Sequence, residues 1–340
     1  MGRCLPGARP ARGNRSRRIA APWVLAILLL APPAALAQGA AEAYASRAIR
    51  LVVNFAPGGT VDVIGRSLAQ KLAEAFAQPV VVENRPGANG NIGAELVARS
   101  RADGYTLLMT SGGALTNNPH LYRSMTVDPL RDFAPISEIA RISPLLVVRP
   151  SLPVKSASEF LAYVRANPGR LSYGSAGNGS GPHISGEMLN RLANVSVVHV
   201  PYKGLGPALG DLLAGQIDFM FDGGGAISQI RSGKIALLAV GSGARLAQFP
   251  DTPTLNEAAV PGFNNDSAHA LLAPAGTPGE VIGRLHREVA RILRTPEIAE
   301  RIRATGAEVI GNAPEEFAAN LRAEHQRMGR FIREAGIRSD

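Results

Sequence analysis

The sequence predicts an α/β fold with mixed, mainly parallel sheets and enough chain for two domains. Apolar runs that are typical of strands alternate with helical patterns along most of the chain. The 340 residues are 46% hydrophobic and 19% charged, which is ordinary globular composition. Five glycine-rich loops each follow a predicted strand, as expected at the carboxyl edge of such a sheet.

The first part of the fold is a series of strand–helix units. The run "IRLVVNF" is a predicted strand, and the apolar residues after it recur at helical spacing: Val61, Ile64, Leu68, Leu72 and Phe76. Three further strands are predicted in "PVVVEN", "YTLLMTS" and "LLVVRP". Helical patterns follow them in "GNIGAELVARS", "GGALTNNPHLY" and "SASEFLAYVRANPG".

The helix in the last of these segments begins with a predicted capping box from Ser156 to Glu159. Strands are predicted next in "LSYGSAG", "SVVHVPY", "IDFMFD" and "IALLAVGS". The C-terminal part is mostly helical. One helix is predicted to have Thr277 as N-cap and Pro278 as first residue, and "PEEFAANLRAEHQRMGRFIREAG" is predicted to be a final amphipathic helix.

Residues 1–37 are predicted to be a cleaved secretory signal peptide. Six arginines precede "WVLAILLLA", which is too short for a stable membrane span, and "ALA" ends at Ala37. Without these arginines the formal charge falls by six from +9 to +3, too weak to indicate a nucleic-acid partner. The single cysteine, Cys4, lies in this leader, so a mature protein would have no disulfide.

Two apolar segments are predicted to cross between domains. They are "SPLLVVRPS" at 143–151 and "HALLAPAG" at 269–276. Each is followed closely by a proline or ends near one.

Five loops share a design that is suited to binding an anion. They read "FAPGGT", "TSGGAL", "GSAGNGSG", "PYKGLG" and "FDGGGA". Glycine lets the backbone approach a ligand, and a helix N-terminus offers free N–H groups and the positive end of a dipole. A single loop of this kind is more often only a tight turn, but five at equivalent positions favour a binding site.

Several familiar motifs are absent. No loop reads G-x-x-x-x-G-K-[ST], no strand is followed by G-x-G-x-x-G, and no G-x-S-x-G is present. The histidines show no metal-ligand spacing, so no metal and no cofactor is predicted. A dyad of His183 with Ser175 or Ser180 stays open, although no third group that would orient the base is visible.

Two acidic residues have alternative roles. Asp62 falls in the first turn of a predicted helix, where the dipole favours a carboxylate, and it also borders the first glycine loop. Asp222 ends "IDFMFD" at the predicted edge of the sheet. It could bind a ligand ammonium or the N–H groups of its own loop.

The chain resembles the periplasmic receptors of tripartite tricarboxylate transporters, often called Bug receptors. The resemblance is carried by segments such as "IRLVVNFAPGGTVDVIGRSLAQKL", "QPVVVENRPGANGNIGAELVA", "YGSAGNGSGPHISGEML" and "HVPYKGLGPALGDLLAGQIDFMFD". Matching segments cover nearly all of 47–337, in order.

The resemblance implies a two-lobed Venus-flytrap of the type II periplasmic-binding-protein class. Lobe 1 would comprise 47–145 and 270–340, and lobe 2 would comprise 146–269. The ligand would be a small organic acid held between the lobes, one carboxylate being bound by backbone N–H groups of "FAPGGT" and "GSAGNGS". The partners would be integral-membrane transporter subunits, and the receptor would be a periplasmic monomer without catalytic activity.

The predicted ligand-binding residues lie in these loops and at the ends of nearby strands. They are Phe55, Ala56, Pro57, Gly58, Gly59, Thr60, Asp62, Ser111, Ser175, Ala176, Gly177, Asn178, Gly179, Ser180, His183, Tyr202 and Asp222.

The chain departs from the family pattern at two places. Ala268, His269 and Ala270 stand where aromatic residues are frequent in the family, and "GGGAISQ" follows Asp222 where Asn and apolar residues are usual. The identity of the ligand therefore stays open. A sensor that presents its ligand to a signalling system is the alternative output, and an exported enzyme on the same fold is the alternative class.

Overall fold

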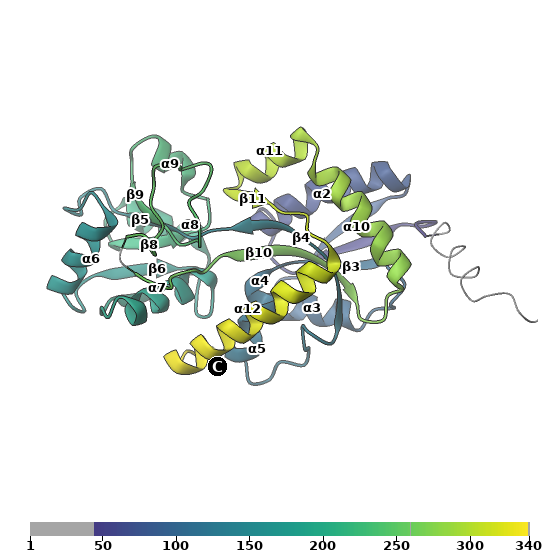
Figure 1. Ribbon diagram of the computed structural model, residues 1–340, viewed down its shortest axis with the longest axis horizontal. Coiled ribbons are helices and arrows are strands. Elements are labelled where there is room, and N and C mark those ends of the chain that lie inside the picture. Colours follow the sequence, from purple (N-terminus) through teal and green to yellow (C-terminus); the bar gives the residue numbers. More distant parts are fainter. Residues whose placement is uncertain (1–43, 259, 339–340) are drawn as a thin grey trace, which may run out of the picture.

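In the computed structural model the chain forms two lobes, each built on its own sheet (Figure 1). The structure describes residues 44–258 and 260–338, so the predicted leader at 1–37 lies outside the described residues. The two-lobed α/β fold is confirmed. Within the described ranges, no helix is long and apolar enough to cross a membrane.

Lobe 1 contains a mixed six-stranded sheet in the order β11-β4-β10-β3-β1-β2. Its strands are β1 (Ile49–Val53), β2 (Val80–Asn84), β3 (Thr106–Ser111), β4 (Phe133–Ile142), β10 (Ser267–Pro274) and β11 (Ala307–Val309). Strand β1 pairs in parallel with β2 and β3, whereas β10 runs antiparallel to β3 and β4. The antiparallel pairs arise because the chain returns from lobe 2 through β10.

Lobe 2 contains a mixed five-stranded sheet in the order β7-β6-β8-β5-β9. Its strands are β5 (Leu145–Val148), β6 (Ser172–Ser175), β7 (Val198–Pro201), β8 (Phe219–Asp222) and β9 (Ala236–Val240). Strand β6 pairs in parallel with β7 and β8, and β5 lies antiparallel between β8 and β9.

Helices cover both faces of each sheet (Figure 1). In lobe 1 they are α2 (Thr60–Phe76), the 3₁₀ turn η1 (Ala88–Gly90), α3 (Asn91–Ala98), α4 (Gly112–Thr116), α5 (Asn118–Leu121), α10 (Gly279–Leu293), α11 (Pro296–Ala304) and α12 (Pro314–Ala335). In lobe 2 they are α6 (Ala157–Ala166), α7 (Gly181–Leu192), α8 (Leu205–Leu213) and α9 (Ile227–Arg231).

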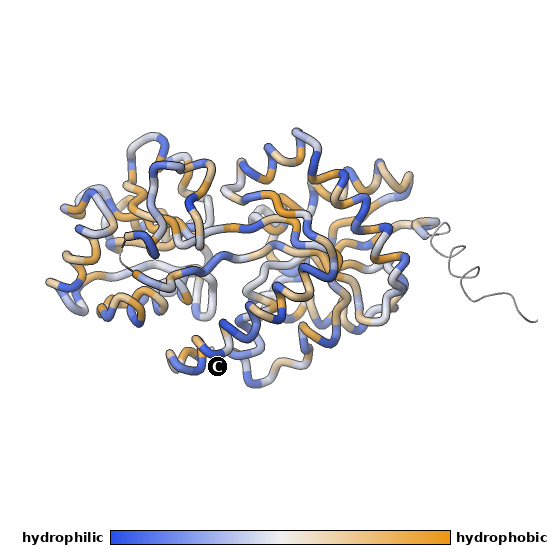
Figure 2. Tube along the Cα trace, viewed as in Figure 1, coloured by the Kyte–Doolittle hydropathy of each residue, from blue (hydrophilic) through white to orange (hydrophobic). Residues whose placement is uncertain are grey.

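The apolar spacing predicted the core of lobe 1 correctly. All five apolar residues of the predicted stripe on α2 are buried, and they pack with the inner residues of β1 and β3. Figure 2 shows the same division, with apolar segments in the sheets and hydrophilic segments concentrated on the outer helices and loops.

Strand β4 has no counterpart in the sequence predictions. It contains Pro135 and the buried Glu138, and proline is normally a sign against a central strand. The structure accommodates Pro135 opposite Leu272, where the pairing with β10 shifts register. A bulge of this kind needs no N–H from that position.

Two predicted helix starts differ in detail from the structure. Ser156 does cap α6, with its Oγ accepting a bond from the Glu159 N–H at 3.1 Å. The Glu159 carboxylate, however, accepts from the Lys155 N–H rather than from the cap itself. The N-cap of α10 is Pro278, because the Thr277 hydroxyl donates back to the Pro274 carbonyl at 2.8 Å.

The chain passes between the sheets within two short segments. It leaves β4 at Ile142 and enters β5 of the other sheet at Leu145. On the return, the Asn265 N–H still bonds the Gly241 carbonyl of lobe 2, and Ser267 already pairs with Ile142 in lobe 1. The predicted crossing at 269–276 therefore begins inside β10, just after the passage, and ends two residues beyond that strand. The division into the two predicted lobes at these segments stays a prediction.

The lobes also meet on either side of the crossing strands, at two rims of different chemistry. At one rim α12 reaches lobe 2, where Met328 and Ile332 pack with Ile184 of α7, and Arg191 bonds Glu334. At the other rim the loop after β8 meets the turn after α11. A Cβ added to Gly224 would lie 2.3 Å from the Thr305 carbonyl oxygen, so the contact is between bare backbones.

Candidate functional site

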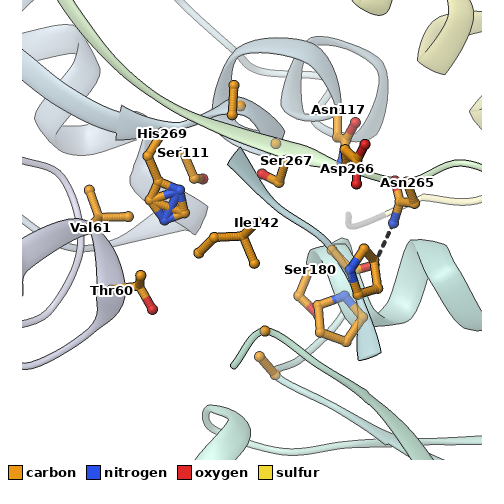
Figure 3. A pocket seen from close by; sticks show the side chains of 18 of the residues that line it. Thr60, Val61, Ser111, Asn117, Ile142, Ser180, Asn265, Asp266, Ser267 and His269 are labelled. Carbon is orange, nitrogen blue, oxygen red and sulfur yellow. Dashed lines mark hydrogen bonds between the residues drawn. The ribbon is translucent and has the colours of Figure 1, made fainter. Parts of the chain in front are cut away.

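A cleft of about 830 Å³ lies between the two lobes. Its walls come from the starts of α2 and α7, the ends of β3 and β8, the crossing segment before β10, and one face of α12. Figure 3 shows Thr60, Val61 and His269 on one side, Ser180 on the other, and Ile142 between them. Both lobes therefore contribute to the walls of one cleft.

Eleven of the predicted ligand-binding residues line this cleft. They are Phe55, Ala56, Pro57, Gly58, Gly59, Thr60, Ser111, Ala176, Gly179, Ser180 and Asp222. The other six are absent from its walls: Asp62, Ser175, Gly177, Asn178, His183 and Tyr202. The structure thus brings the predicted loops together, while the role of each residue in binding stays a prediction.

The first loop presents the N-terminus of α2 to the cleft. Gly59 is the N-cap and makes no side-chain cap, so the N–H groups of Thr60 and Val61 begin the helix with no partner within it. Both residues line the cleft. This end of a 17-residue helix therefore offers donors and a positive dipole end to a ligand.

Asp62 supports this loop from behind. It accepts from the Gly58 N–H at 2.9 Å, from Arg66 at 2.9 Å and from Asn84 at 2.8 Å. Burial raises the pKa of Asp62, but these donors outweigh burial and leave the pKa below its ordinary value. The carboxylate thus fixes the loop, and Asp62 itself does not line the cleft.

The second loop uses several of its own N–H groups internally. The Gly177 N–H donates to Ser175 Oγ at 3.1 Å, the Gly179 N–H to His183 Nδ1 at 3.0 Å, and the Ser180 N–H to the Gly177 carbonyl at 3.2 Å. The N-terminus of α7 lines the cleft next to this loop, with Ser180 as N-cap and Gly181 as first residue. Gly181 was not among the predicted residues.

The histidine behind this loop is arranged differently from the dyad left open above. Ser175 Oγ lies 2.6 Å from Nε2 of His199, not from His183. The His183 and His199 rings stack with their centroids 4.1 Å apart, and the Tyr173 ring stacks with His199 at 5.0 Å between centroids. Ser175 is fully buried and does not line the cleft, so this pair has no access to a ligand there.

Asp222 binds the N–H groups of its own loop with only one of its two oxygens. One oxygen, Oδ2, accepts from the N–H groups of Gly224 at 2.6 Å and Ala226 at 2.8 Å. The other oxygen, Oδ1, is buried without a hydrogen-bond partner among the described residues. Burial raises the pKa of Asp222, and the loop N–H groups oppose that rise.

Tyr202 forms its hydrogen bond within lobe 2. Its hydroxyl donates to Asp211 at 2.7 Å, and burial together with that carboxylate raises its pKa to about 12. The partly buried ring packs against the core of lobe 2, and Tyr202 does not line the cleft.

The cleft contains polar residues that the sequence did not predict. His269 from β10 is buried, and its Nδ1 has no hydrogen-bond partner within 44–258 and 260–338. Asn265 donates to the Gly181 carbonyl at 3.0 Å and to Ser185 at 2.7 Å, which ties the crossing segment to the start of α7 (Figure 3). The departure from the family pattern at 268–270 was the one signal pointing to His269.

The buried histidines predict a pH-dependent stability. Burial lowers the pKa of His269 to about 4, and burial followed by the His183 ring lowers that of His199 to about 4 against the effect of Glu187. The pKa of these two histidines in the unfolded state is about 6.5. Below this pH they bind protons in the unfolded state but stay neutral in the folded state. The free energy of unfolding should therefore fall as pH falls from about 6.5 to about 4.

Urea denaturation at several pH values measures this effect. His269→Gln removes one titrating group and should flatten the dependence, whereas His286→Gln, on α10 and outside the cleft, serves as a matched substitution. A free energy of unfolding that stays constant over this pH range would contradict the prediction.

Comparison with known proteins places this architecture in a family. Residues 64–337 match the family model described as "Tripartite tricarboxylate transporter family receptor". The chain is 35% identical to Protein BugT of Bordetella pertussis over 300 residues, which cover 88% of this chain and 92% of BugT.

Two solved structures with bound ligands are similar as well. The R. palustris protein Rpa4515, solved with adipate, is 37% identical to this chain, with a TM-score of 0.79. The match covers 87% of this chain and 99% of the Rpa4515 chain. MatC (Rpa3494) from Rhodopseudomonas palustris, solved with bound malate, is 33% identical to this chain, with a TM-score of 0.75. The match covers 84% of this chain and 99% of the MatC chain. The chain belongs to the tripartite tricarboxylate transporter receptor family, whose members are periplasmic solute-binding receptors.

Proposed function

We propose that this receptor captures a small carboxylate in the cleft by closing its two lobes and delivers it to a membrane transporter. The protein acts as a monomer after export and removal of residues 1–37, and it binds its ligand without converting it. The geometry of the cleft supports the first part of this proposal, and the family of the chain supports the second.

The observation that carries the proposal is the meeting of two helix N-termini. Helix α2 begins at Thr60 in lobe 1 and α7 begins at Gly181 in lobe 2, and both residues line the same cleft. A carboxylate between them would accept bonds from both lobes at once. It would therefore bind the closed arrangement better than an open one, which is the condition for ligand-driven closure.

The ligands of similar proteins agree with this assignment. Adipate and malate, named for the two ligand-bound structures, are both dicarboxylates. The shared feature that we carry over to this chain is one carboxylate, because the helix starts that would hold it are present here. The rest of the ligand is a separate question, since the wall near His269 departs from the family pattern.

A proline at Thr60 tests the role of the α2 N–H groups. Thr60 is the first residue of the helix, where proline is well tolerated, and Gly59 before it is extended with ψ of 166°. Thr60→Pro thus removes one N–H with little disturbance of the fold. We expect carboxylate binding to weaken about tenfold or more, the effect of losing one charge-assisted hydrogen bond.

Thr60→Val is the matched control, because it removes the hydroxyl and keeps the N–H. Isothermal titration calorimetry with a six-carbon carboxylate such as hexanoate or adipate gives the affinity of each variant, and circular dichroism checks the fold. Equal affinities of the folded proline and valine variants would show that this N–H does not bind the ligand.

A further inference from the structure

The charge of the cleft wall limits what the rest of the ligand can be. Six charged side chains line the cleft, and four of them are acidic. They are Glu138, Arg141, Asp222, Asp266, Glu324 and Arg327. The lining therefore has two more carboxylates than guanidinium groups, although the site is expected to bind an acid.

Both arginines already have acidic partners. Arg141 Nη2 lies 2.8 Å from Glu138 Oε2, and Arg327 Nη2 lies 2.5 Å from Glu324 Oε1. Neither Asp222 nor Asp266 forms an ion pair with any described residue. Asp266 accepts from the Ser143 hydroxyl at 2.7 Å, and burial raises its pKa even though Arg141 acts in the opposite direction.

The two unpaired carboxylates belong to one part of the cleft. Asp266 bonds Ser143, which lies in the segment where the chain crosses between the lobes. Asp222 is the register partner of Leu145, two residues further along the same segment. Asp222 is 1% exposed and its Oδ1 has no hydrogen-bond partner within the described chain. A buried carboxylate oxygen without a donor is costly, so it marks a place for a donor from outside the chain.

We propose that the ligand is a zwitterion: its carboxylate lies at the starts of α2 and α7, and its ammonium group lies between Asp222 and Asp266. This inference rests on the proposed function and adds the second half of the ligand to it. An ammonium group supplies donors to Asp222 Oδ1 and offsets the excess negative charge of the wall. A dicarboxylate would instead bring a second negative charge toward two carboxylates that have no cation partner.

Six-carbon probes separate the contributions of the two ends. We would titrate the full mature protein with ε-aminocaproate, norleucine, hexanoate, adipate and hexylamine in low-salt buffer near neutral pH. At least one of the two amino acids should bind about tenfold or more tightly than hexanoate and adipate, because it adds one charge-assisted bond. Comparison of norleucine with ε-aminocaproate shows how far the ammonium lies from the carboxylate.

Asp222→Asn tests the assignment of the residue without removing its structural role. The asparagine carbonyl can still accept from the Gly224 and Ala226 N–H groups, while an NH₂ group replaces the unpartnered oxygen. The preference for the amino acid should disappear in this variant and weaken in Asp266→Asn. Asp218→Asn is the matched control: Asp218 also accepts from a backbone N–H, of Ser172 at 2.8 Å, but it does not line the cleft.

The outcomes distinguish the two proposals. If hexanoate or adipate binds as tightly as both amino acids, or if both cleft variants keep the preference, the ammonium site is wrong and the carboxylate site stands. If hexylamine binds as tightly as the amino acids, the carboxylate proposal fails and the cation site stands. If none of the five probes binds, both are overturned.

Discussion

Replacing Gly224 by alanine is expected to hold the two lobes apart. The added Cβ would lie 2.3 Å from the Thr305 carbonyl oxygen of lobe 1, and the Gly224 φ of +109° disfavours any side chain. Neither group can move aside cheaply, because the obstacle is backbone. We expect the closed form to lose about 3 kcal/mol, which weakens ligand binding roughly a hundredfold.

Small-angle scattering and calorimetry with the six-carbon probes measure this effect. The radius of gyration of the variant should exceed that of the unmodified protein at the same probe concentration. Gly223→Ala is the matched control, since its Cβ would meet only Ile142 and Leu205 side chains at 3.7 and 3.8 Å. If Gly224→Ala binds and scatters like Gly223→Ala, the glycine contact does not limit closure.

Gly186→Ala is expected to destabilise lobe 2 strongly. A Cβ at this position of α7 would lie 2.1 Å from Tyr173 Cζ and 2.2 Å from Cε2. Tyr173 is fully buried, bonds Glu187 at 2.8 Å and stacks between His199 and Phe219. The ring therefore has no room to retreat, and we expect a loss of about 3 kcal/mol in the free energy of unfolding.

Urea denaturation of the variant measures that loss. Gly181→Ala, five residues earlier in the same helix, has open space around its added Cβ and controls for the change of residue type. Adding Tyr173→Leu to Gly186→Ala should restore part of the stability, because the clash is with the ring. A single variant as stable as Gly181→Ala would contradict the predicted packing.

The sequence was informative wherever a pattern is local. The apolar spacing from Val61 to Phe76 located α2 because one buried face of a helix repeats every three to four residues. Strand β4 has no such pattern. Its Glu138 is buried through contacts with the distant Asn312, whose amide donates to Glu138 and whose side-chain oxygen accepts the Glu138 N–H. A partner 174 residues away cannot be deduced from composition.

The candidate site shows the same limit. Glycine-rich loops after strands predicted correctly which segments gather at the cleft, but not which N–H groups remain free there. In the second loop Gly179 donates to the His183 ring, a contact that depends on how α7 leaves the loop. The unpaired state of Asp222 depends likewise on which charges the crossing segment and α12 bring into the cleft.

The unlike rims of the cleft have a calorimetric consequence. Apolar surface raises the heat capacity of a protein when it meets water, by about 0.45 cal/K/mol per Å², whereas polar surface lowers it by about 0.26. Separation at Gly224 and Thr305 would wet mainly peptide groups, but separation at Met328, Ile332 and Ile184 would wet side-chain hydrocarbon. The temperature dependence of the binding enthalpy is the heat-capacity change on binding, and it therefore indicates which rim opens and closes. This heat-capacity change should be near zero if the glycine rim moves, and clearly negative on closure if the rim formed by α12 and α7 moves.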